Sequence, residues 1–169
     1  MRRIVLLAAA AAALCAVPAA FAGNAHFIKS ATGVNLISSG SNAGNLVCSF
    51  KEAGLESGST ETITCSGDEV VTYECVNNGG KNPSASNKTA TNTSFSQSGT
   101  FSADKNGNVV GSLTVSPASA ASIGFSCPSG QTVTFVSVCY SNVTITDSTS
   151  GATAGPFEGP FCFTNPNAP

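Results

Sequence analysis

The chain has 169 residues, of which only 9% are charged, and its formal net charge at pH 7 is −2. Its basic residues form no cluster, whereas binding to nucleic acid or to anionic lipid needs concentrated lysine and arginine. Seven cysteines in so short a chain are typical of disulfide-bonded proteins from oxidising compartments. We therefore predict an exported protein with neither a nucleic-acid nor a membrane partner.

The N-terminal residues 1–22 have the features of a secretory signal peptide. A pair of arginines follows the first methionine, and residues 4–17 form an apolar run that is too short to span a bilayer. The sequence Ala-Phe-Ala, which ends at Ala22, places small residues where a signal peptidase reads them. We place the cleavage after Ala22, so that residues 23–169 form a single domain with six of the seven cysteines.

The rest of the chain alternates between apolar and polar residues with a period of two, which is typical of strands with one buried face. No helical pattern interrupts this alternation, and short turn sequences separate the runs. The sequence therefore predicts an all-β fold, a single antiparallel immunoglobulin-like β-sandwich of about eight to nine strands. The expected strands include residues 26–30, 34–37, 46–51, 60–65, 68–75, 95–101, 113–115 and 131–145.

Turns and connections carry their own signals. Residues 104–107 (Asp-Lys-Asn-Gly) predict the clearest hairpin, because Asn-Gly readily adopts the positive φ angles of a tight turn. Residues 148–169 are rich in glycine and proline, and we expect them to pack on the domain as an extended tail held by Cys162. The longest polar connection, residues 77–92, is the candidate contact loop, since loops on rigid scaffolds often bind partners. Its candidate contact residues are Asn77, Asn78, Gly79, Gly80, Lys81 and Asn82.

The six cysteines of the mature chain include no Cys-x-x-Cys pair, so their spacing excludes zinc-knuckle and thioredoxin-like sites. We expect three disulfides, although six cysteines allow 15 connectivities. The favoured pairs are Cys48–Cys65, Cys75–Cys127 and Cys139–Cys162.

Candidate catalytic residues are few. The only histidine, His26, lies near the mature N-terminus, where we expect it to be exposed or on an edge strand. Asp68 and Glu74 share a strand face, but six residues separate them by about 20 Å, too far for a glycosidase pair. Glu69 points to the opposite face. Glu52, Glu56 and Glu61 could meet another acid across strands, but no motif indicates it, so we expect these acids to be solvated. We therefore predict no catalytic, metal or cofactor site.

Three Thr-x-Thr pairs have two interpretations. They could form a flat ladder of the kind that binds ice, or they could lie on ordinary exposed strand faces, which we favour because threonine is common in strands. The pairs are Thr60/Thr62, Thr132/Thr134 and Thr144/Thr146. Asn-x-Ser/Thr sequons occur at Asn87, Asn92 and Asn142.

Several segments together resemble a group of small secreted proteins from actinobacteria and related microbes. The segments are SFKEAGL (49–55), CVNNGGKNP (75–83), GTF (99–101), CPSGQ (127–131) and YSNVT (140–144). That group has no assigned activity, so the resemblance implies a secreted β-rich domain and supplies no site. It also supports the pairing of Cys75 with Cys127, because both lie within the resembling motifs.

A second resemblance covers one hairpin. Residues 101–117 are similar to a hairpin of actinomycete apo-chromoproteins such as the neocarzinostatin family, which are secreted immunoglobulin-like sandwiches that carry a reactive small molecule. From all these features we expect a secreted, non-enzymatic binding or structural domain whose partner is an extracellular protein or surface. The alternatives are a carrier of a small ligand and an inhibitor of an extracellular hydrolase.

Overall fold

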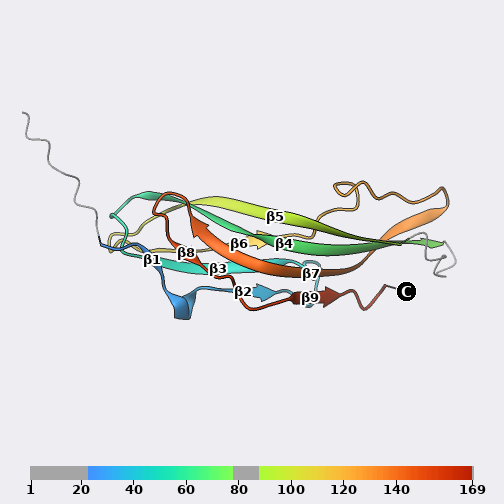
Figure 1. Cartoon of the computed structure of the whole chain (residues 1–169), viewed down its shortest axis with the longest axis horizontal. Helices are drawn as coiled ribbons and strands as arrows, with labels where there is room; N and C mark the ends of the chain where they lie inside the picture. Colours follow the sequence, from blue (N-terminus) through green and yellow to red (C-terminus); the bar gives the residue numbers. More distant parts are fainter. Residues whose placement is uncertain (1–22, 78–87, 169) are drawn as a thin grey trace, which may run out of the picture.

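The computed structural model describes residues 23–77 and 88–168. They form two antiparallel sheets joined by the Cys48–Cys65 disulfide, a β-sandwich, as the period-two pattern predicts. The molecule is elongated, and β4, β5 and β7 run along most of its length (Figure 1). The predicted signal peptide and five of the six candidate contact residues, from Asn78 to Asn82, lie outside the described residues.

The first sheet is built around β3, which pairs with β6 along one edge and with β1 and β2 along the other. Its strands are β1 (His26–Phe27), β2 (Gly33–Leu36), β3 (Leu46–Ala53) and β6 (Val109–Val115). The strand expected at residues 26–30 is too long, because a 3-10 turn (Lys29–Ala31) interrupts it. The N–H of Ala31 donates to the carbonyl of Ile28 at 2.9 Å and closes this turn.

The second sheet has β4 at its centre, between β5 and β7. Its strands are β4 (Thr60–Asn77), β5 (Lys88–Ser102), β7 (Gln131–Asp147), β8 (Thr153–Ala154) and β9 (Phe161–Thr164). The two strands expected at 60–65 and 68–75 are one continuous strand. The strand expected at 95–101 begins earlier, at Lys88, so the predicted connection 77–92 is too long. Threonine on the inward positions before Phe95, in place of larger apolar residues, hides this extension in the sequence.

The predicted tail forms part of the second sheet, because β8 and β9 both pair with the outer edge of β7. Cys162 on β9 lies opposite Cys139 on β7, and the two form a disulfide. The other disulfides join Cys48 to Cys65, which links β3 of one sheet to β4 of the other, and Cys75 to Cys127. These are the three pairs that the sequence analysis favours.

The core lies between the sheets, and its side chains come from the inward positions of β3 and β6 in one sheet and of β4, β5, β7 and β9 in the other. Tyr140 is completely buried, its ring packs edge-to-face on Phe95 with centroids 5.5 Å apart, and its hydroxyl donates to the Gly44 carbonyl at 2.9 Å. A second edge-to-face pair, Phe50 and Phe101, has centroids 4.9 Å apart. The fully buried aliphatic residues include Leu46, Ile63, Val71, Val138, Val143 and Ile145.

The Asp104–Gly107 turn forms as predicted, but it is not a hairpin. The Gly107 N–H donates to the Asp104 carbonyl at 3.0 Å, and Asp104 Oδ1 accepts the Asn106 and Asn108 N–H groups at 2.7 and 2.9 Å. The strands on either side belong to different sheets, since β5 pairs with β4 and β6 pairs with β3. Buried Ala103 and Val109 flank the turn, so that the chain crosses from one sheet to the other at the edge of the core.

Replacing Gly107 by alanine should destabilise the fold. Gly107 has φ +70°, and an added Cβ would lie 2.1 Å from the Leu55 carbonyl oxygen, which belongs to the backbone. We expect a loss of at least about 2 kcal/mol in a denaturant titration. The matched control is Gly58→Ala, at φ +79° with no atom within 4 Å of the added Cβ, which should lose about 1 kcal/mol. Equal losses in the two variants would contradict the predicted clash.

Candidate functional site

The outer face of the second sheet carries an array of small hydroxyl side chains, which we call the hydroxyl face. Its residues alternate with the buried residues of the same strands, so their side chains point away from the core. The hydroxyl face comprises Thr60, Thr62, Thr64 and Ser66 on β4, Ser94, Ser96, Ser98, Thr100 and Ser102 on β5, and Thr144 and Thr146 on β7.

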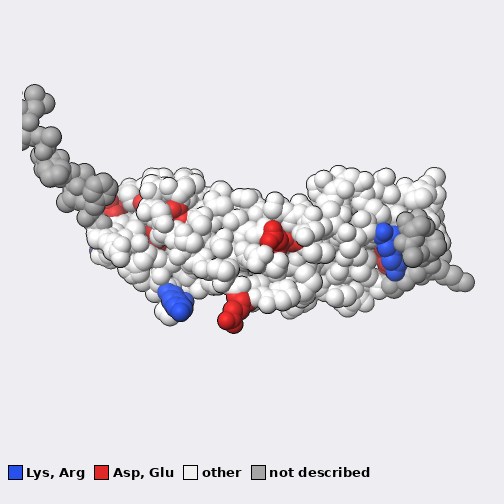
Figure 2. All heavy atoms as spheres, in the orientation of Figure 1, with Lys and Arg blue, Asp and Glu red and all other residues white. Residues whose placement is uncertain are grey.

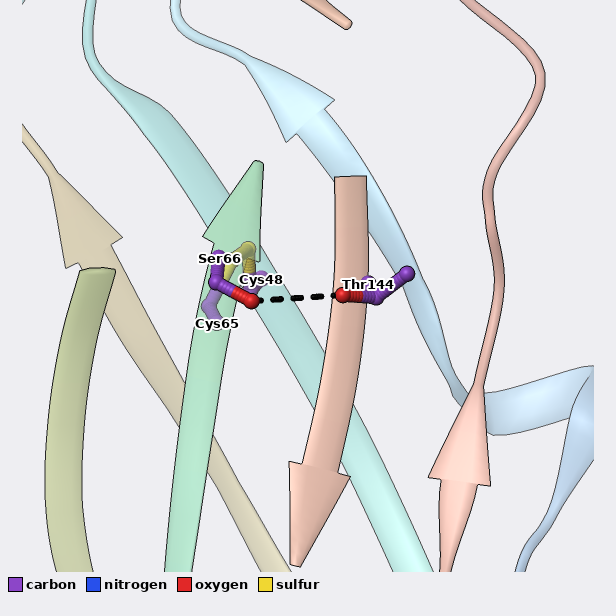
Figure 3. Close-up of a disulfide and its surroundings, with 4 residues drawn as sticks. All are labelled: Cys48, Cys65, Ser66 and Thr144. Atoms are coloured by element: carbon purple, nitrogen blue, oxygen red, sulfur yellow. Dashed lines mark hydrogen bonds between the residues drawn. A yellow bond between two sulfur atoms is a disulfide. The ribbon is translucent and has the colours of Figure 1, made fainter. Parts of the chain in front are cut away.

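The strand register aligns these hydroxyls in rows across the sheet. Thr64 lies opposite Ser98 on one side and Thr146 on the other, and Ser66 lies opposite Ser96 and Thr144. Thr64 Oγ1 and Ser98 Oγ are hydrogen-bonded at 2.7 Å, and Ser66 Oγ and Thr144 Oγ1 at 3.3 Å (Figure 3). Each hydroxyl can both donate and accept, so the rows offer a partner an uncharged pattern of donors and acceptors.

The hydroxyl face lies over a covalently fixed part of the core. Cys65 stands between Thr64 and Ser66 on β4, and its side chain points inward to the disulfide with Cys48 (Figure 3). No residue of the hydroxyl face is charged, and charged side chains appear only as isolated spots on the view of the surface in Figure 2. Asp68, which accepts a 2.8 Å hydrogen bond from the Asn142 side chain, lies beyond Ser66 at one end.

The Thr-x-Thr pairs therefore separate into two groups. Thr60/Thr62 and Thr144/Thr146 lie on the hydroxyl face, whereas Thr132 and Thr134 pair with the far end of β4 near Val76 and Glu74. Two pairs contribute to one array, and β5 completes it with serines that the Thr-x-Thr pattern does not reveal.

A cluster of three carboxyl groups lies inside the sandwich, at one end of the two sheets. Glu52 on β3, Glu61 on β4 and Asp147 on β7 are 0%, 3% and 1% exposed. Ser150 Oγ donates to Glu52 at 2.6 Å, Ser59 Oγ donates to Glu61, and the Thr149 N–H donates to Asp147 at 2.8 Å. The expectation that Glu52 and Glu61 are solvated is wrong; Glu56 is exposed, as expected.

The three groups differ in their affinity for protons. Burial raises the pKa of Glu52 to about 7, and the charge of Asp147 and a hydrogen bond with Asp147 act in the same direction. The hydrogen bond from the Ser150 hydroxyl acts to lower this pKa. Burial also raises the pKa of Glu61. Burial acts to raise the pKa of Asp147 as well, but hydrogen bonds from the Thr149 N–H, Glu61, Glu52 and Ser150 hold it below its usual value.

Hydrogen bonds between Asp147 and each of the two glutamates raise the pKa of both glutamates and lower that of Asp147. One oxygen of each of the three carboxyl groups has no hydrogen-bond partner outside the cluster. The cluster is closed to solvent, so it can hold protons but offers no surface on which a substrate could sit. Its chemistry fits a structural role.

The remaining acids on β4 point in different directions. Glu69 lies in the core and accepts the Ala118 N–H at 3.2 Å, and burial raises its pKa while this hydrogen bond acts against the rise. Glu74 is 1% exposed and forms an ion pair with Lys88 at 2.9 Å. Asp68 and Glu74 are not brought together.

The other sequence-predicted positions are dispersed. His26 is exposed on the edge strand β1, as expected, and its Nδ1 lies 2.8 Å from the Asn24 carbonyl oxygen. Asn77, at the end of β4, accepts a hydrogen bond from the Gln131 side chain at 2.9 Å. The sequons Asn92 and Asn142 lie exposed on β5 and β7, and Asn87 lies outside the described residues.

At least two open grooves lined by described residues lie along the edges of the sandwich. One has a volume of about 570 Å³ and runs between the N-terminal segment and the chain after β8, where Phe27 and Phe157 face it together with Lys29 and Glu158. The other, of about 340 Å³, lies beside Phe135 and Phe163. In residues 23–77 and 88–168 no group of histidine, cysteine or acidic residues has the arrangement of a metal site.

Within the same described residues, no helix is long and apolar enough to cross a membrane. The fold and the three disulfides define this protein as a disulfide-stabilised β-sandwich. No protein-family model matches the chain, and neither a curated protein nor a solved structure matches it.

Proposed function

We propose that this protein is a secreted, non-enzymatic, immunoglobulin-like binding domain, and that the hydroxyl face is its contact surface. The observation that carries the proposal is the in-register array of serine and threonine side chains across β5, β4 and β7. Three disulfides suit a domain that works in an oxidising environment. The Cys48–Cys65 bond fixes the sheet beneath the array, which keeps the array ordered without the partner.

The partner that suits this surface is a neutral polysaccharide. An uncharged array attracts neither nucleic acid nor acidic or basic polymers, whereas sugar hydroxyls can pair with both the donors and the acceptors of the rows. The array extends over three strands and contains no aromatic ring for stacking, so binding rests on many weak hydrogen bonds spread over an extended chain. Such contacts favour an insoluble polymer over a single sugar, because binding at several sites raises the overall affinity.

The test is co-sedimentation of the protein with microcrystalline cellulose and with chitin, measured over a range of polymer concentrations. The variant Thr62→Val/Thr64→Val/Thr146→Val removes three central hydroxyls with little change in shape or strand propensity. We expect binding to at least one polymer and at least a tenfold loss in the variant, since each lost hydrogen bond contributes about 1 kcal/mol.

The matched control removes three exposed threonines elsewhere, as Thr114→Val/Thr132→Val/Thr164→Val. It should bind like the wild type. No binding of the wild type, or an equal loss in both variants, would contradict the proposal. Inhibition of ice growth without polysaccharide binding would assign the hydroxyl face to ice instead.

A second function, the carrying of a small apolar ligand, is favoured by the groove between Phe27 and Phe157. Native mass spectrometry of the protein taken from its own producer's medium tests it. A bound molecule that is lost on denaturation would support the carrier function, and a bare polypeptide mass would contradict it. The denatured, non-reduced mass also tests cleavage after Ala22 and the loss of six hydrogens expected for three disulfides.

A further inference from the structure

The outer edge of β5 is a long unpaired strand edge. β5 spans 15 residues and pairs with β4 along one edge, while no strand in the described part of the chain pairs with the other. In an antiparallel sheet every second residue directs its N–H and C=O groups to a given edge, so about seven residues of β5 present these groups outward. Within the described residues, the side-chain contacts to these outward groups are long, from the Thr93 and Gln97 side chains to the Ser94 and Ser98 carbonyls at 3.5 and 3.4 Å.

This edge lacks the features by which proteins usually block edge-to-edge pairing, namely charges, prolines, bulges and short strand length. From Thr89 to Ser102 the strand contains no charged residue and no proline, and its register with β4 shows no shift. Its single charge, Lys88, lies at the first residue and is paired with Glu74 at 2.9 Å. The side chains beside the edge are small, so a second backbone can approach closely.

We propose that β5 pairs antiparallel with β5 of a second copy of this chain, across a two-fold axis perpendicular to the sheet. Antiparallel pairing of a strand with itself is self-complementary, because the donors of each copy meet the acceptors of the other. The two Lys88 side chains lie at opposite ends of the paired strands, so like charges do not meet. Serine and threonine on the two strands face one another across the axis, a pairing that antiparallel sheets favour.

The dimer would form one continuous sheet from the two β4–β5–β7 sheets. A two-fold axis perpendicular to this sheet leaves both outer faces on the same side, so the two hydroxyl faces merge into one surface of twice the width. The pairing itself depends only on the free backbone edge, and it stands or falls independently of what the hydroxyl face binds.

The test is light scattering coupled to size exclusion over a range of concentrations of the wild-type protein, together with hydrogen exchange at each concentration. We expect the mass to rise toward twice that of the chain, and exchange to slow in peptides that cover residues 89–102 as it does so. A monomer at all concentrations up to about 200 µM would overturn the proposal, since a specific pair of this kind should associate in that range.

The variant Ser94→Lys/Ser96→Lys adds charges at two exposed positions of β5, and it should shift the equilibrium to monomer by at least tenfold. The control Ser112→Lys/Thr114→Lys adds the same charge at exposed positions of β6, the edge of the other sheet, and should dimerise like the wild type. Dissociation of both variants, or of neither, would overturn the assignment of the interface to β5.

Discussion

We expect the protein to lose about 3 kcal/mol of stability as the pH rises from 4.5 to 8, because Glu52 must give up a proton inside the core. Burial and the neighbouring Asp147 raise the pKa of Glu52 from 4.5 to about 7. Between these values the folded state binds more protons than the unfolded state, so the free energy of unfolding decreases with pH. The stabilisation is complete below pH 4.5 and is lost once the pH exceeds about 7.

Two other acids act in the same direction, since burial also raises the pKa values of Glu61 and Glu69. Asp147 has a lowered pKa, so its contribution to the pH dependence of stability lies below the pH range in which aspartates ordinarily titrate. Chemical denaturation at half-unit steps from pH 4.5 to 8 measures the slope. The sign of this slope is informative, because most proteins with partnered carboxylates lose stability as the pH falls and not as it rises.

Glu52→Gln isolates the contribution of this one group. The amide keeps the shape of the protonated acid and can still accept the Ser150 hydroxyl, but it cannot ionise. We expect most of the pH dependence to disappear and the stability at pH 8 to exceed that of the wild type. Glu56→Gln, at an exposed position, should leave the slope unchanged. A Glu52→Gln protein with the wild-type slope would show that Glu52 is not the titrating group.

Removal of the inter-sheet disulfide has the second large expected effect. Cys48→Ala/Cys65→Ala should lower the free energy of unfolding by about 3 kcal/mol, as expected for a closed loop of this size. The cysteines are 17 residues apart and completely buried, and theirs is the only disulfide that joins β3 to β4. Because Cys65 lies between Thr64 and Ser66, hydrogen exchange should also accelerate in the part of β4 that carries the hydroxyl face.

Cys139→Ala/Cys162→Ala is the comparison for this effect. The Cys139–Cys162 bond closes a loop of 23 residues, but it joins strands that are already neighbours in one sheet. We expect a similar loss of global stability without faster exchange on β4. If the two variants loosen β4 equally, the Cys48–Cys65 bond has no special role under the hydroxyl face.

The alternation of residues predicts the all-β sandwich and most strand positions, because one-face burial imposes the same period on every strand. It cannot assign strands to sheets. The Asp104–Gly107 turn has the composition of a hairpin turn, yet it joins β5 to β6 across the sandwich. Turn chemistry specifies the local backbone, whereas the partner of each strand depends on packing elsewhere.

The acid cluster illustrates a signal that was present but outweighed. Glu52 is in phase with Cys48 and Phe50, and Glu61 with Ile63, so alternation alone would place both on the core face. Asp147 likewise continues the inward positions of Val143 and Ile145. The sequence leaves open that these acids meet across strands, but no motif indicates it, so solvation is the default expectation. The structure brings the three acids together from three strands, where hydrogen bonds between them offset part of the cost of burial.

The most direct test of the proposed contact surface is an NMR titration of the ¹⁵N-labelled protein with soluble cello- and chito-oligosaccharides. We expect the amide signals of Thr64, Ser66, Ser98 and Thr146 to shift or broaden with increasing ligand, while those of Ser112 and Thr114 on the first sheet remain unchanged. Changes confined to the first sheet or to the groove beside Phe27, or no changes with either sugar, would contradict the assignment of the hydroxyl face as a polysaccharide-binding surface.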